Sequence, residues 1–390
     1  MLKRLKVKNF KSLENFEVEF EKFNVLVGRN NSGKSNVIDC LKFLSEGFRD
    51  PIEKIFIRRG GYKEVVFGGN EENDVEIGVE FELNFEKEKF LFEYHVKISG
   101  KRDVREIIEE KVEITDGKYK MVEIPNLGWF GKIVYGNIPS IVRQSIPIYS
   151  YDPDKPRNNK ELLIGKLLRK ETVGMALLSA FQNIYTYKII PQNIKTEYSS
   201  VFVDKYLLLD EGCENLALFL LKLSQQDKKR FERTKELLSG VVDDIEDISP
   251  TVEGKHVYLK VKDKNFDKYF YPESISDGTI SLLSYITIIE TIKENTIVCF
   301  EEPENYIHMR LLEFLVDLMK NSGSQVILAT HSPYFIDRCE PDELIIIEKE
   351  NGKTTARKID PERIKREIGE YGGTLGEMYY SDEFKKEKGE

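Results

Sequence analysis

Cysteine, histidine and tryptophan are scarce in this 390-residue sequence, with four, four and one copies. The cysteines lie far apart and form no C-x-x-C pair, which argues against a zinc site or a disulfide framework and fits a reducing, intracellular compartment. No apolar run approaches the ~20 residues of a membrane span. The first residues alternate basic and apolar side chains, unlike the continuous apolar core of a signal peptide. We therefore expect a cytoplasmic protein with no membrane partner.

Positive charge is not in excess either. The chain has 59 Lys and Arg against 68 Asp and Glu, a net charge of −9, so any polyanion must bind to a local patch. One basic segment is 155–170, with six basic residues and one acid. It predicts either the solvated face of an amphipathic helix or a surface for nucleic acid or a protein partner. Hydrophobic residues make up 40% of the chain, enough for real cores in two or three domains.

The most informative segment is 25–36, where an apolar strand pattern, a glycine-bounded loop and a helical pattern follow one another. Gly28, Gly33, Lys34 and Ser35 fit the P-loop spacing G-x-x-x-x-G-K-[ST]. Such a loop turns successive N–H groups toward phosphate oxygens, and the helix behind it adds its positive end. Lys34 would reach the β- and γ-phosphates, and the Ser35 hydroxyl would bind Mg²⁺. The predicted nucleotide-binding residues of this loop are Gly28, Arg29, Asn30, Asn31, Ser32, Gly33, Lys34, Ser35 and Asn36.

A P-loop alone leaves kinases, GTPases and many ATPases open, and a second motif narrows the choice. Residues 297–300 are apolar and are followed by Glu301, Glu302, Pro303 and Glu304, which is typical of a Walker B strand. Burial of the strand would leave the acids at its end, beside Mg²⁺ and the attacking water. We expect Glu301 to bind the metal ion and Glu302 to act as the general base. Aspartate is usual at the first position, so Glu301 departs from the pattern.

Two further segments carry polar groups at the ends of apolar elements. His331 follows the apolar strand pattern 327–329 and could hydrogen-bond a γ-phosphate. The tetrapeptide Ser-Asp-Gly-Thr at 276–279 precedes an apolar helix pattern, and a helix N-terminus favours anions. Taken singly, a strand-end histidine or a helix start is more often structural, and the order of the motifs gives both their weight. We predict that Lys34, Glu302 and His331 are catalytic.

The order of these motifs resembles that of the ABC-type ATPase heads of the RecF/SMC/OLD-like class. The motifs are the P-loop, the Ser-Asp-Gly-Thr segment, the Glu-Glu-Pro-Glu strand end and the Thr-His-Ser-Pro segment. The chain is most similar to the stand-alone predicted AAA-type ATPases of this class, without a long coiled coil or a fused nuclease domain. Residues 9–12, 210–217 and 373–379 also resemble segments of these heads. The resemblance covers most of 1–45 and 190–380.

The resemblance implies binding and hydrolysis of ATP with Mg²⁺ in a homodimer that encloses the nucleotide. Ser276, Gly278 and Thr279 of one copy would contact the γ-phosphate bound to Lys34 of the other. This arrangement suits the chemistry, because no arginine finger can be assigned and a helix N-terminus would supply the missing positive potential.

Two more positions follow from the resemblance. Lys11 is expected to approach the phosphates, as the matching basic residue does in related heads. The heads of this family also carry a glutamine in a segment called the Q-loop. Gln144 and Gln192 are both candidates for it, and the sequence does not decide between them.

The expected fold class is α/β: a P-loop NTPase of the ABC-type head, with a mainly parallel sheet covered by helices, an antiparallel β layer and a helical insertion. We assign residues 1–147 to lobe I, with the P-loop and the antiparallel layer. Residues 148–195 form the helical insertion. Residues 196–390 form lobe II, which carries the Ser-Asp-Gly-Thr segment (the signature), the Walker B strand end and His331 (the switch histidine).

The sequence also predicts the bounds of four local elements. Residues 16–27 should form one strand, and 214–238 one helix with a charged stretch. The next strand should begin only after Pro250. The dipeptide Asn351-Gly352 between two apolar or β-branched runs predicts a hairpin.

The leading functional hypothesis is an ATPase whose dimerisation acts on DNA or on a partner protein, in DNA repair or in defence against foreign DNA. The alternative is a slowly hydrolysing switch in which ATP assembles a scaffold that controls a separately encoded nuclease or toxin. Glu301 in place of aspartate favours this alternative. A transporter subunit fits poorly, because the β-rich stretch 65–124 and the Ser-Asp-Gly-Thr segment are unlike those subunits.

Overall fold

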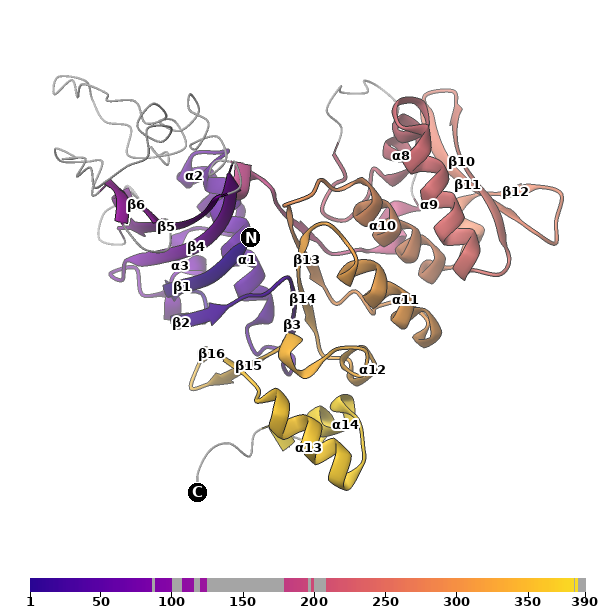
Figure 1. Cartoon of the computed structure of the whole chain (residues 1–390). Coiled ribbons are helices and arrows are strands. Elements are labelled where there is room, and N and C mark those ends of the chain that lie inside the picture. The colour runs from indigo at the N-terminus through magenta and orange to yellow at the C-terminus, as the bar shows by residue number, and fades with distance from the viewer. Residues whose placement is uncertain are drawn as a thin grey trace, which may run out of the picture. The chain divides into compact units, whose positions relative to one another are not determined.

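A computed structural model gives the fold of the chain (Figure 1). It describes residues 1–85, 88–99, 107–115, 120–124, 179–195, 198–199, 208–381 and 383–384. The chain divides into two compact units, each assembled from separate stretches of sequence. Unit 1 comprises Met1–Ile184, Asn295–Ile297 and Ile345–Lys358, and unit 2 comprises Tyr185–Glu294, Val298–Leu344 and Ile359–Glu390. The lobe boundaries predicted at residues 147 and 195 stay a prediction.

Unit 1 contains the expected antiparallel β layer, a six-stranded sheet in the order β2-β1-β4-β5-β6-β7. Apolar residues alternate along β1, β2, β4 and β5, and their inward side chains are buried, as the period-two pattern predicts. The strands are β1 (Leu2–Phe10), β2 (Leu13–Glu19), β4 (Val75–Phe85), β5 (Glu88–Ile98), β6 (Ile107–Thr115) and β7 (Lys120–Ile124).

The prediction of one strand over 16–27 is wrong. The chain leaves the antiparallel sheet after β2 and begins a new strand, β3 (Phe23–Val27). The Asn24 side chain closes the bend between them: its Oδ1 accepts from Glu21 N at 2.7 Å, and its Nδ2 donates to Glu21 O at 2.8 Å. A side chain that bonds to nearby backbone in this way competes with the strand ladder.

Strand β3 belongs to the second sheet of unit 1, in the order β16-β15-β3, with β15 (Leu344–Glu350) and β16 (Lys353–Lys358). The predicted hairpin is confirmed, because β15 and β16 pair antiparallel around Asn351 and Gly352. Both turn residues have positive φ, 51° and 83°, as a type I′ turn requires.

In the described part of unit 1, the helices before the antiparallel strands β4–β7 are α1 (Lys34–Gly47), α2 (Ile52–Arg58), α3 (Tyr62–Val65) and the 3₁₀ turn η1 (Phe67–Gly69). An aromatic cluster joins the end of α1 to the antiparallel sheet. The Phe181 ring stacks on Phe48 at 4.1 Å between centroids and meets Phe81 and Tyr94 edge-on at 5.0 Å. Phe181 lies in the helical insertion predicted over 148–195, of which 148–178 lie outside the described residues, as does the whole basic segment 155–170.

Unit 2 contains a small antiparallel sheet in the order β10-β11-β12, with β9 also pairing with β11. Its strands are β9 (Tyr198–Ser199), β10 (Ile245–Glu253), β11 (His256–Asp263) and β12 (Tyr269–Phe270). The expectation that a strand begins only after Pro250 is wrong, since Pro250 lies within β10. Among the described strands β10 lies at the edge of its sheet, one of the positions to which proline is confined in sheets.

The single helix predicted over 214–238 is also wrong. The structure has two helices, α8 (Leu216–Gln226) and α9 (Lys228–Val241). Asp227 separates them with φ −140° and ψ 73°, and its side chain accepts a hydrogen bond from Arg230 N. Aspartate favours this N-cap role over a helix-interior position, so the apolar periodicity continues across a real break.

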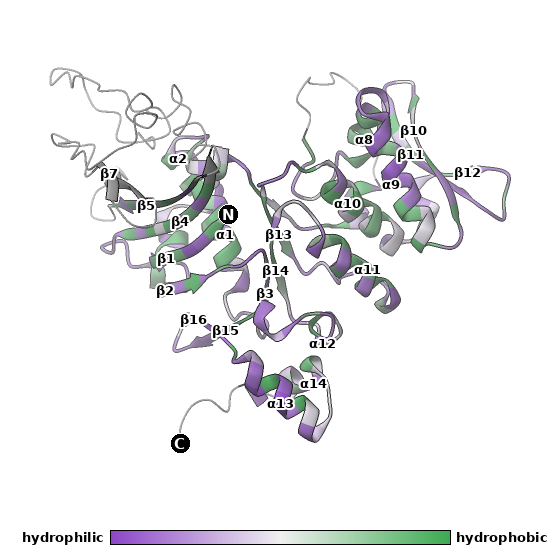
Figure 2. Ribbon diagram, viewed as in Figure 1, coloured by the Kyte–Doolittle hydropathy of each residue, from purple (hydrophilic) through white to green (hydrophobic). Residues whose placement is uncertain are grey.

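The remaining elements of unit 2 include strands in the order β14-β13-β8, which are β8 (Ile184–Tyr187), β13 (Ile297–Glu301) and β14 (Gln325–Thr330). Its helices are α7 (Pro191–Ile194), α10 (Asp277–Thr291), α11 (Met309–Lys320), α12 (Pro333–Ile336), α13 (Pro361–Tyr371) and α14 (Leu375–Tyr380), with 3₁₀ turns η3 (Pro272–Ser274) and η4 (Pro341–Glu343). Helix α10 buries eleven of its 15 residues, and Figure 2 shows it green along most of its length.

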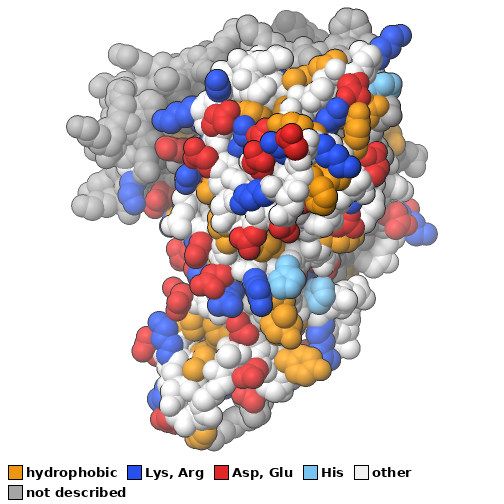
Figure 3. All heavy atoms as spheres, turned by 90° about the vertical axis from the view of Figure 1, so that its right-hand side faces the viewer, with side chains coloured by type: hydrophobic (Ala, Val, Ile, Leu, Met, Phe, Trp, Pro, Cys, Tyr) orange, Lys and Arg blue, Asp and Glu red, His pale blue; other side chains and the backbone are white. Residues whose placement is uncertain are grey.

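On the face shown in Figure 3, acidic and basic side chains are interspersed rather than gathered by sign. No helix in the described part of the chain is both long and apolar enough to span a bilayer.

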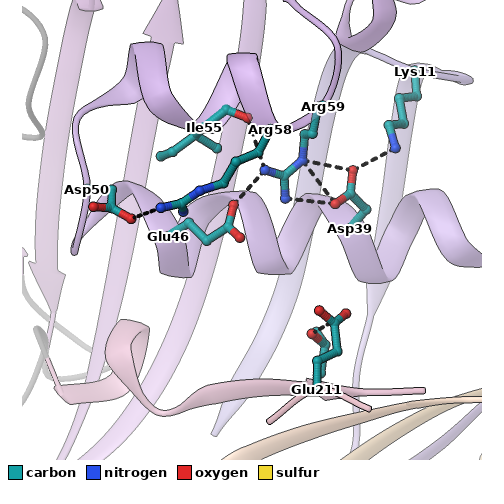
Figure 4. A network of polar contacts seen from close by, with 9 residues as sticks. Lys11, Asp39, Glu46, Asp50, Ile55, Arg58, Arg59 and Glu211 are labelled. Carbon is teal, nitrogen blue, oxygen red and sulfur yellow. Dashed lines mark hydrogen bonds and ion pairs between the residues drawn. The ribbon is translucent and has the colours of Figure 1, made fainter. Parts of the chain in front are cut away.

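Helix α1 is tied to the chain around it by a partly buried charge network (Figure 4). The Arg59 guanidinium donates to both oxygens of Asp39, with its shortest contact at 2.7 Å, and to Glu46 Oε2 at 2.5 Å. The shortest Arg59 contact is to Asp39 Oδ1, and the Lys11 ammonium lies 2.7 Å from Asp39 Oδ2. Asp39 and Glu46 are on α1, so the helix that follows the P-loop is fixed from two directions.

The network perturbs the pKa of Asp39. Burial acts to raise this pKa, but the hydrogen bond and charge of Arg59 and the Lys11 ammonium outweigh burial, so the pKa lies below its ordinary value of 3.8. A depressed pKa contributes stability above the unfolded-state value, and that contribution disappears as the pH falls through the folded-state value.

We expect Asp39→Asn to lower the free energy of unfolding by about 2 kcal/mol at pH 7, because charged hydrogen bonds are lost. The difference from wild type should begin to shrink as the pH falls below about 3.8, where the carboxylate of the unfolded chain is protonated, and should vanish below the lower pKa of the folded carboxylate. Urea unfolding across pH 7 to 3 measures both effects. Asp50→Asn, which removes a more exposed ion pair with Arg58, is the control. An Asp39→Asn deficit that stays constant with pH would contradict this account.

Candidate nucleotide-binding site

Close packing explains the two glycines of the P-loop in unit 1. A Cβ on Gly28 would lie 2.2 Å from Ile347 O and 2.6 Å from Ser32 Oγ. Gly33 caps α1 with φ 106°, and a Cβ there would lie 2.2 Å from Thr354 Oγ1. Both positions therefore need glycine, because a larger residue would push the loop away from β15 and β16.

Lys34 begins α1 and is 6% exposed. Its Nζ donates to Gly28 O at 2.6 Å and to Arg29 O at 3.1 Å, so the ammonium lies across the concave side of its own loop. No acidic residue occupies the first turn of α1, and the helix end keeps its positive potential. This donor set suits phosphate oxygens.

The rest of the loop divides into exposed and buried residues. Arg29, Asn30, Asn31 and Ser35 are exposed, Asn36 is half-buried, and Ser32 is buried. Ser32 Oγ is shielded from solvent and has no hydrogen-bond partner among the described residues. A buried hydroxyl without a partner fits a loop that gains polar contacts when a phosphate binds.

A hydrogen-bonded chain that the sequence did not reveal holds the loop from outside. Asn36 Nδ2 donates to Ser12 Oγ at 2.7 Å, and Ser12 Oγ lies 2.7 Å from Thr354 Oγ1. Thr354 Oγ1 in turn donates to Ser32 O at 2.8 Å. The chain gives a structural role to the Asn-Phe-Lys-Ser segment at 9–12, while Thr354 lies far along the sequence and belongs to no motif.

Lys11 is the candidate from this segment that was expected near phosphate. In the structure its ammonium pairs with Asp39, as described above, and its backbone has a left-handed φ of 50°. Its approach to a nucleotide stays a prediction.

Glu302 in unit 2 has a geometry typical of a functional position. It follows β13 with φ 47°, a conformation that costs a non-glycine residue about 1–3 kcal/mol. Its N–H donates to Ala329 O at 2.8 Å, which fixes the turn. Its Oε2 accepts from Asn305 Nδ2 at 2.9 Å, and its Oε1 lies 3.4 Å from His331 Nδ1. The structure thus brings together the predicted base and the predicted switch histidine, and adds Asn305.

Neighbouring acids of the Walker B segment have other partners. Glu301 Oε2 lies 3.4 Å from Lys188 Nζ. Burial raises the pKa of Glu304 above its ordinary value, although a hydrogen bond from Thr330 opposes this rise. Thr330 Oγ1 also accepts from Ser332 N at 3.0 Å, so Glu304 connects the Walker B turn to the loop that carries the histidine.

The Ser-Asp-Gly-Thr segment begins α10, as predicted. Ser276 is the N-cap, and its Oγ accepts from Thr279 N at 3.1 Å. A Cβ on Gly278 would lie 2.6 Å from Tyr306 O, so this glycine admits the backbone that follows Walker B. Gln192, one of two Q-loop candidates, donates to Asp277 Oδ2 at 2.8 Å, and Gln144 lies outside the described residues.

The predicted metal ligands lie in different units, Ser35 in unit 1 and Glu301 in unit 2. No group of three or more His, Cys, Asp or Glu side chains in the described ranges is placed to hold a metal ion. Mg²⁺ in phosphate-transferring sites is bound by one or two protein ligands together with phosphates and water. The assignment of Ser35 and Glu301 as metal ligands stays a prediction.

Comparison with known proteins assigns the family. The model of the "AAA ATPase domain" family matches residues 1–336. The chain belongs to this family. As an AAA ATPase domain protein it is an ATPase with a P-loop, and the prediction of ATP as its nucleotide is consistent with this assignment.

Relatives of this AAA ATPase domain protein include the Old nuclease of Escherichia phage P2, 25% identical over 93% of the chain and 62% of the relative. RecF, a DNA replication and repair protein of Phocaeicola vulgatus, is 38% identical over 17% of the chain and 19% of its own length. The ATP/GTP phosphatase of Helicobacter pylori is 40% identical over 11% of the chain and 12% of its own length. The chain therefore spans less than two thirds of each of these relatives.

Solved structures support the fold of the AAA ATPase domain protein. An SMC head bound to the C-winged helix domain of ScpA superposes with a TM-score of 0.53 at 15% identity, covering 94% of the chain and 99% of the head. The Smc head domain with an extended coiled coil, bound to the C-terminal domain of ScpA derived from Pyrococcus furiosus, gives 0.51 at 13% identity, covering 95% and 99%. The predicted α/β P-loop fold and the ABC-type RecF/SMC/OLD-like head are confirmed.

Thr354→Val should loosen the P-loop without changing side-chain volume. Loss of the hydroxyl removes the hydrogen bonds of Thr354 to Ser32 O and Ser12 Oγ, at a cost of about 1–3 kcal/mol in unfolding free energy. We expect ATP affinity to fall severalfold as well, because the loop is less well held. Urea unfolding and titration with a fluorescent ATP analogue measure the two quantities.

Thr355→Val is the matched control, since Thr355 is the next residue on β16 and is exposed. Its stability and ATP affinity should equal those of wild type. Equal effects of the two substitutions would show that the hydroxyl of Thr354 does not support the loop.

Proposed function

We propose that the protein hydrolyses ATP with Mg²⁺ and that ATP binding brings two copies together. The observation that carries the proposal is the 3.4 Å approach of Glu302, on a strained turn directly after β13, to His331, which directly follows β14. The same chain has a complete P-loop. A base and a phosphate-sensing group held close together at the ends of two strands suit a site that must distinguish ATP from ADP.

The roles of the residues follow from their chemistry. The P-loop N–H groups and Lys34 bind the β- and γ-phosphates, and Ser35 and Glu301 hold Mg²⁺, which neutralises phosphate charge when bound. The Glu302 carboxylate orients a water molecule and accepts its proton as the water oxygen bonds to the γ-phosphorus. The bond from that phosphorus to the bridging oxygen breaks, giving ADP and phosphate. His331 contacts the γ-phosphate.

The second copy supplies the positive potential that completes the site. Ser276, Gly278 and Thr279 at the start of α10 would face the γ-phosphate bound by the other copy. The Ser276 cap holds this helix end in shape, and a helix of 15 residues offers free N–H groups and a positive dipole to an anion. Hydrolysis removes the γ-phosphate and with it the contact that joins the copies.

The dimer is proposed to act on DNA or on a partner protein, in repair or in defence against foreign DNA. The support is the character of the similar proteins: one is named a nuclease, one a DNA replication and repair protein, and the similar SMC heads were solved with ScpA domains.

A slowly hydrolysing scaffold that controls a separate effector is the second candidate. The observation that favours it is Glu301, which replaces the usual aspartate and pairs with Lys188 at 3.4 Å. A lysine beside the metal ligand competes with Mg²⁺ for the carboxylate. Turnover measured with and without duplex DNA separates the candidates: stimulation by DNA supports the working ATPase, and slow turnover in both conditions supports the scaffold.

Glu302→Gln should bind ATP yet lose nearly all hydrolysis, because the amide cannot accept the proton. With ATP and Mg²⁺ this variant should become a stable dimer, and without nucleotide it should be a monomer. Size-exclusion chromatography with light scattering measures the mass, and phosphate release measures turnover.

Glu313→Gln on the exposed side of α11 is the control and should hydrolyse ATP like wild type. Wild-type turnover in Glu302→Gln would refute the assignment of the base. A monomer in both conditions would refute the contact of the signature with the other copy's nucleotide.

A further inference from the structure

The beginning of α10 carries a negative charge where a phosphate is proposed to bind. Asp277 is the first residue of the helix, between Ser276 and Gly278. Its carboxylate would repel a triphosphate, so the sequence alone places an obstacle inside the signature segment. In the structure, two side chains bind this carboxylate.

Two side chains from one short segment engage both oxygens of the carboxylate. Lys195 Nζ lies 2.6 Å from Asp277 Oδ1, and Gln192 Nε2 donates to Oδ2 at 2.8 Å. Gln192 lies in α7, and Lys195 follows its last residue. The carboxylate is thus neutralised by one partner and held in a single orientation by both.

Lys195 also fixes the chain that leads into the helix. Its ammonium donates to Ile275 O at 2.6 Å, one residue before the Ser276 cap. The Lys195 side chain is 17% exposed and that of Asp277 35% exposed. The pair is therefore partly shielded, and a charge left without its partner here would be screened by water only in part.

We propose that Lys195 and Gln192 are positioning residues of the signature, which neutralise and orient Asp277 so that the start of α10 can accept the γ-phosphate bound by a second copy. They act through Asp277 and need not touch the nucleotide. The inference rests on the proposed function, in which α10 meets the nucleotide of the other copy. It gives a purpose to Gln192 that differs from that of a Q-loop glutamine.

The decisive variant is Lys195→Met in the Glu302→Gln background, which leaves Asp277 charged and without its cation. The ATP concentration for half-maximal dimer, measured by light scattering, should rise on the order of tenfold, the size expected for one uncompensated charge near the phosphate. The affinity of the monomer for a fluorescent ATP analogue should stay unchanged, because Lys195 lies outside the P-loop.

Removing the carboxylate charge should reverse the defect. Lys195→Met combined with Asp277→Asn should dimerise at an ATP concentration within about twofold of the parent, since no charge is left to neutralise. Lys195→Arg should keep dimerisation near the parent level. Failure of the double variant while Lys195→Arg remains competent would mean that the lysine contacts the phosphate itself, and would overturn the positioning role.

Two further variants complete the test. Lys262→Met removes another ion pair of unit 2, with Glu246 at 3.1 Å, and should leave dimerisation unchanged. Gln192→Leu removes the second partner of Asp277 and should weaken dimerisation in the same direction as Lys195→Met. If Lys195→Met fails to fold, Gln192→Leu alone tests whether the partners of Asp277 support dimerisation.

The inference and the proposed function fail in different ways. If Lys195→Met and Gln192→Leu dimerise like the parent while Ser276→Arg does not, the role of Lys195 and Gln192 is wrong and the signature contact stands. If Ser276→Arg also dimerises normally, the proposed function itself is wrong.

Discussion

The close approach of the P-loop backbone to the β15–β16 hairpin is the constraint on which unit 1 depends. Gly28 leaves room for the Ile347 carbonyl, and Gly33 leaves room for the Thr354 side chain. The same approach lets Thr354 hydrogen-bond into the loop. A phosphate cradle made of backbone N–H groups works only if the backbone is held still, and here a strand from the distant end of the sequence holds it.

Unit 2 stores strain at the turn that carries the predicted base. The left-handed backbone at Glu302 is tolerated because its N–H bonds to Ala329 O and its side chain meets Asn305 and His331. Glu304, with a raised pKa, links the same turn to Thr330. One connected group of contacts therefore positions both the predicted base and the predicted phosphate sensor. A substitution at either residue should change the position of the other side chain.

Compensated charge is common to both units. Asp39 on α1 is held by Arg59 and Lys11, and Asp277 on α10 is held by Lys195 and Gln192. Each acid lies in a helix that carries a proposed phosphate-binding end, and each is neutralised by residues from another segment. Acids in these helices keep the fold in place without opposing the binding of an anion.

Motif spacing in the sequence determined the P-loop, the Walker B strand end, the helix start at Ser276 and the Asn351-Gly352 hairpin. These features depend on neighbours within a few residues, where glycine, capping and apolar periodicity act directly. The sequence failed where a single side chain competes with periodicity, as Asn24 does after β2 and Asp227 does between α8 and α9. Only the tertiary structure decided the partners of the site residues: Thr354 for the P-loop, Asn305 for Glu302 and Lys195 for Asp277. Those contacts join segments separated along the chain, and no local pattern encodes which segments the fold brings together.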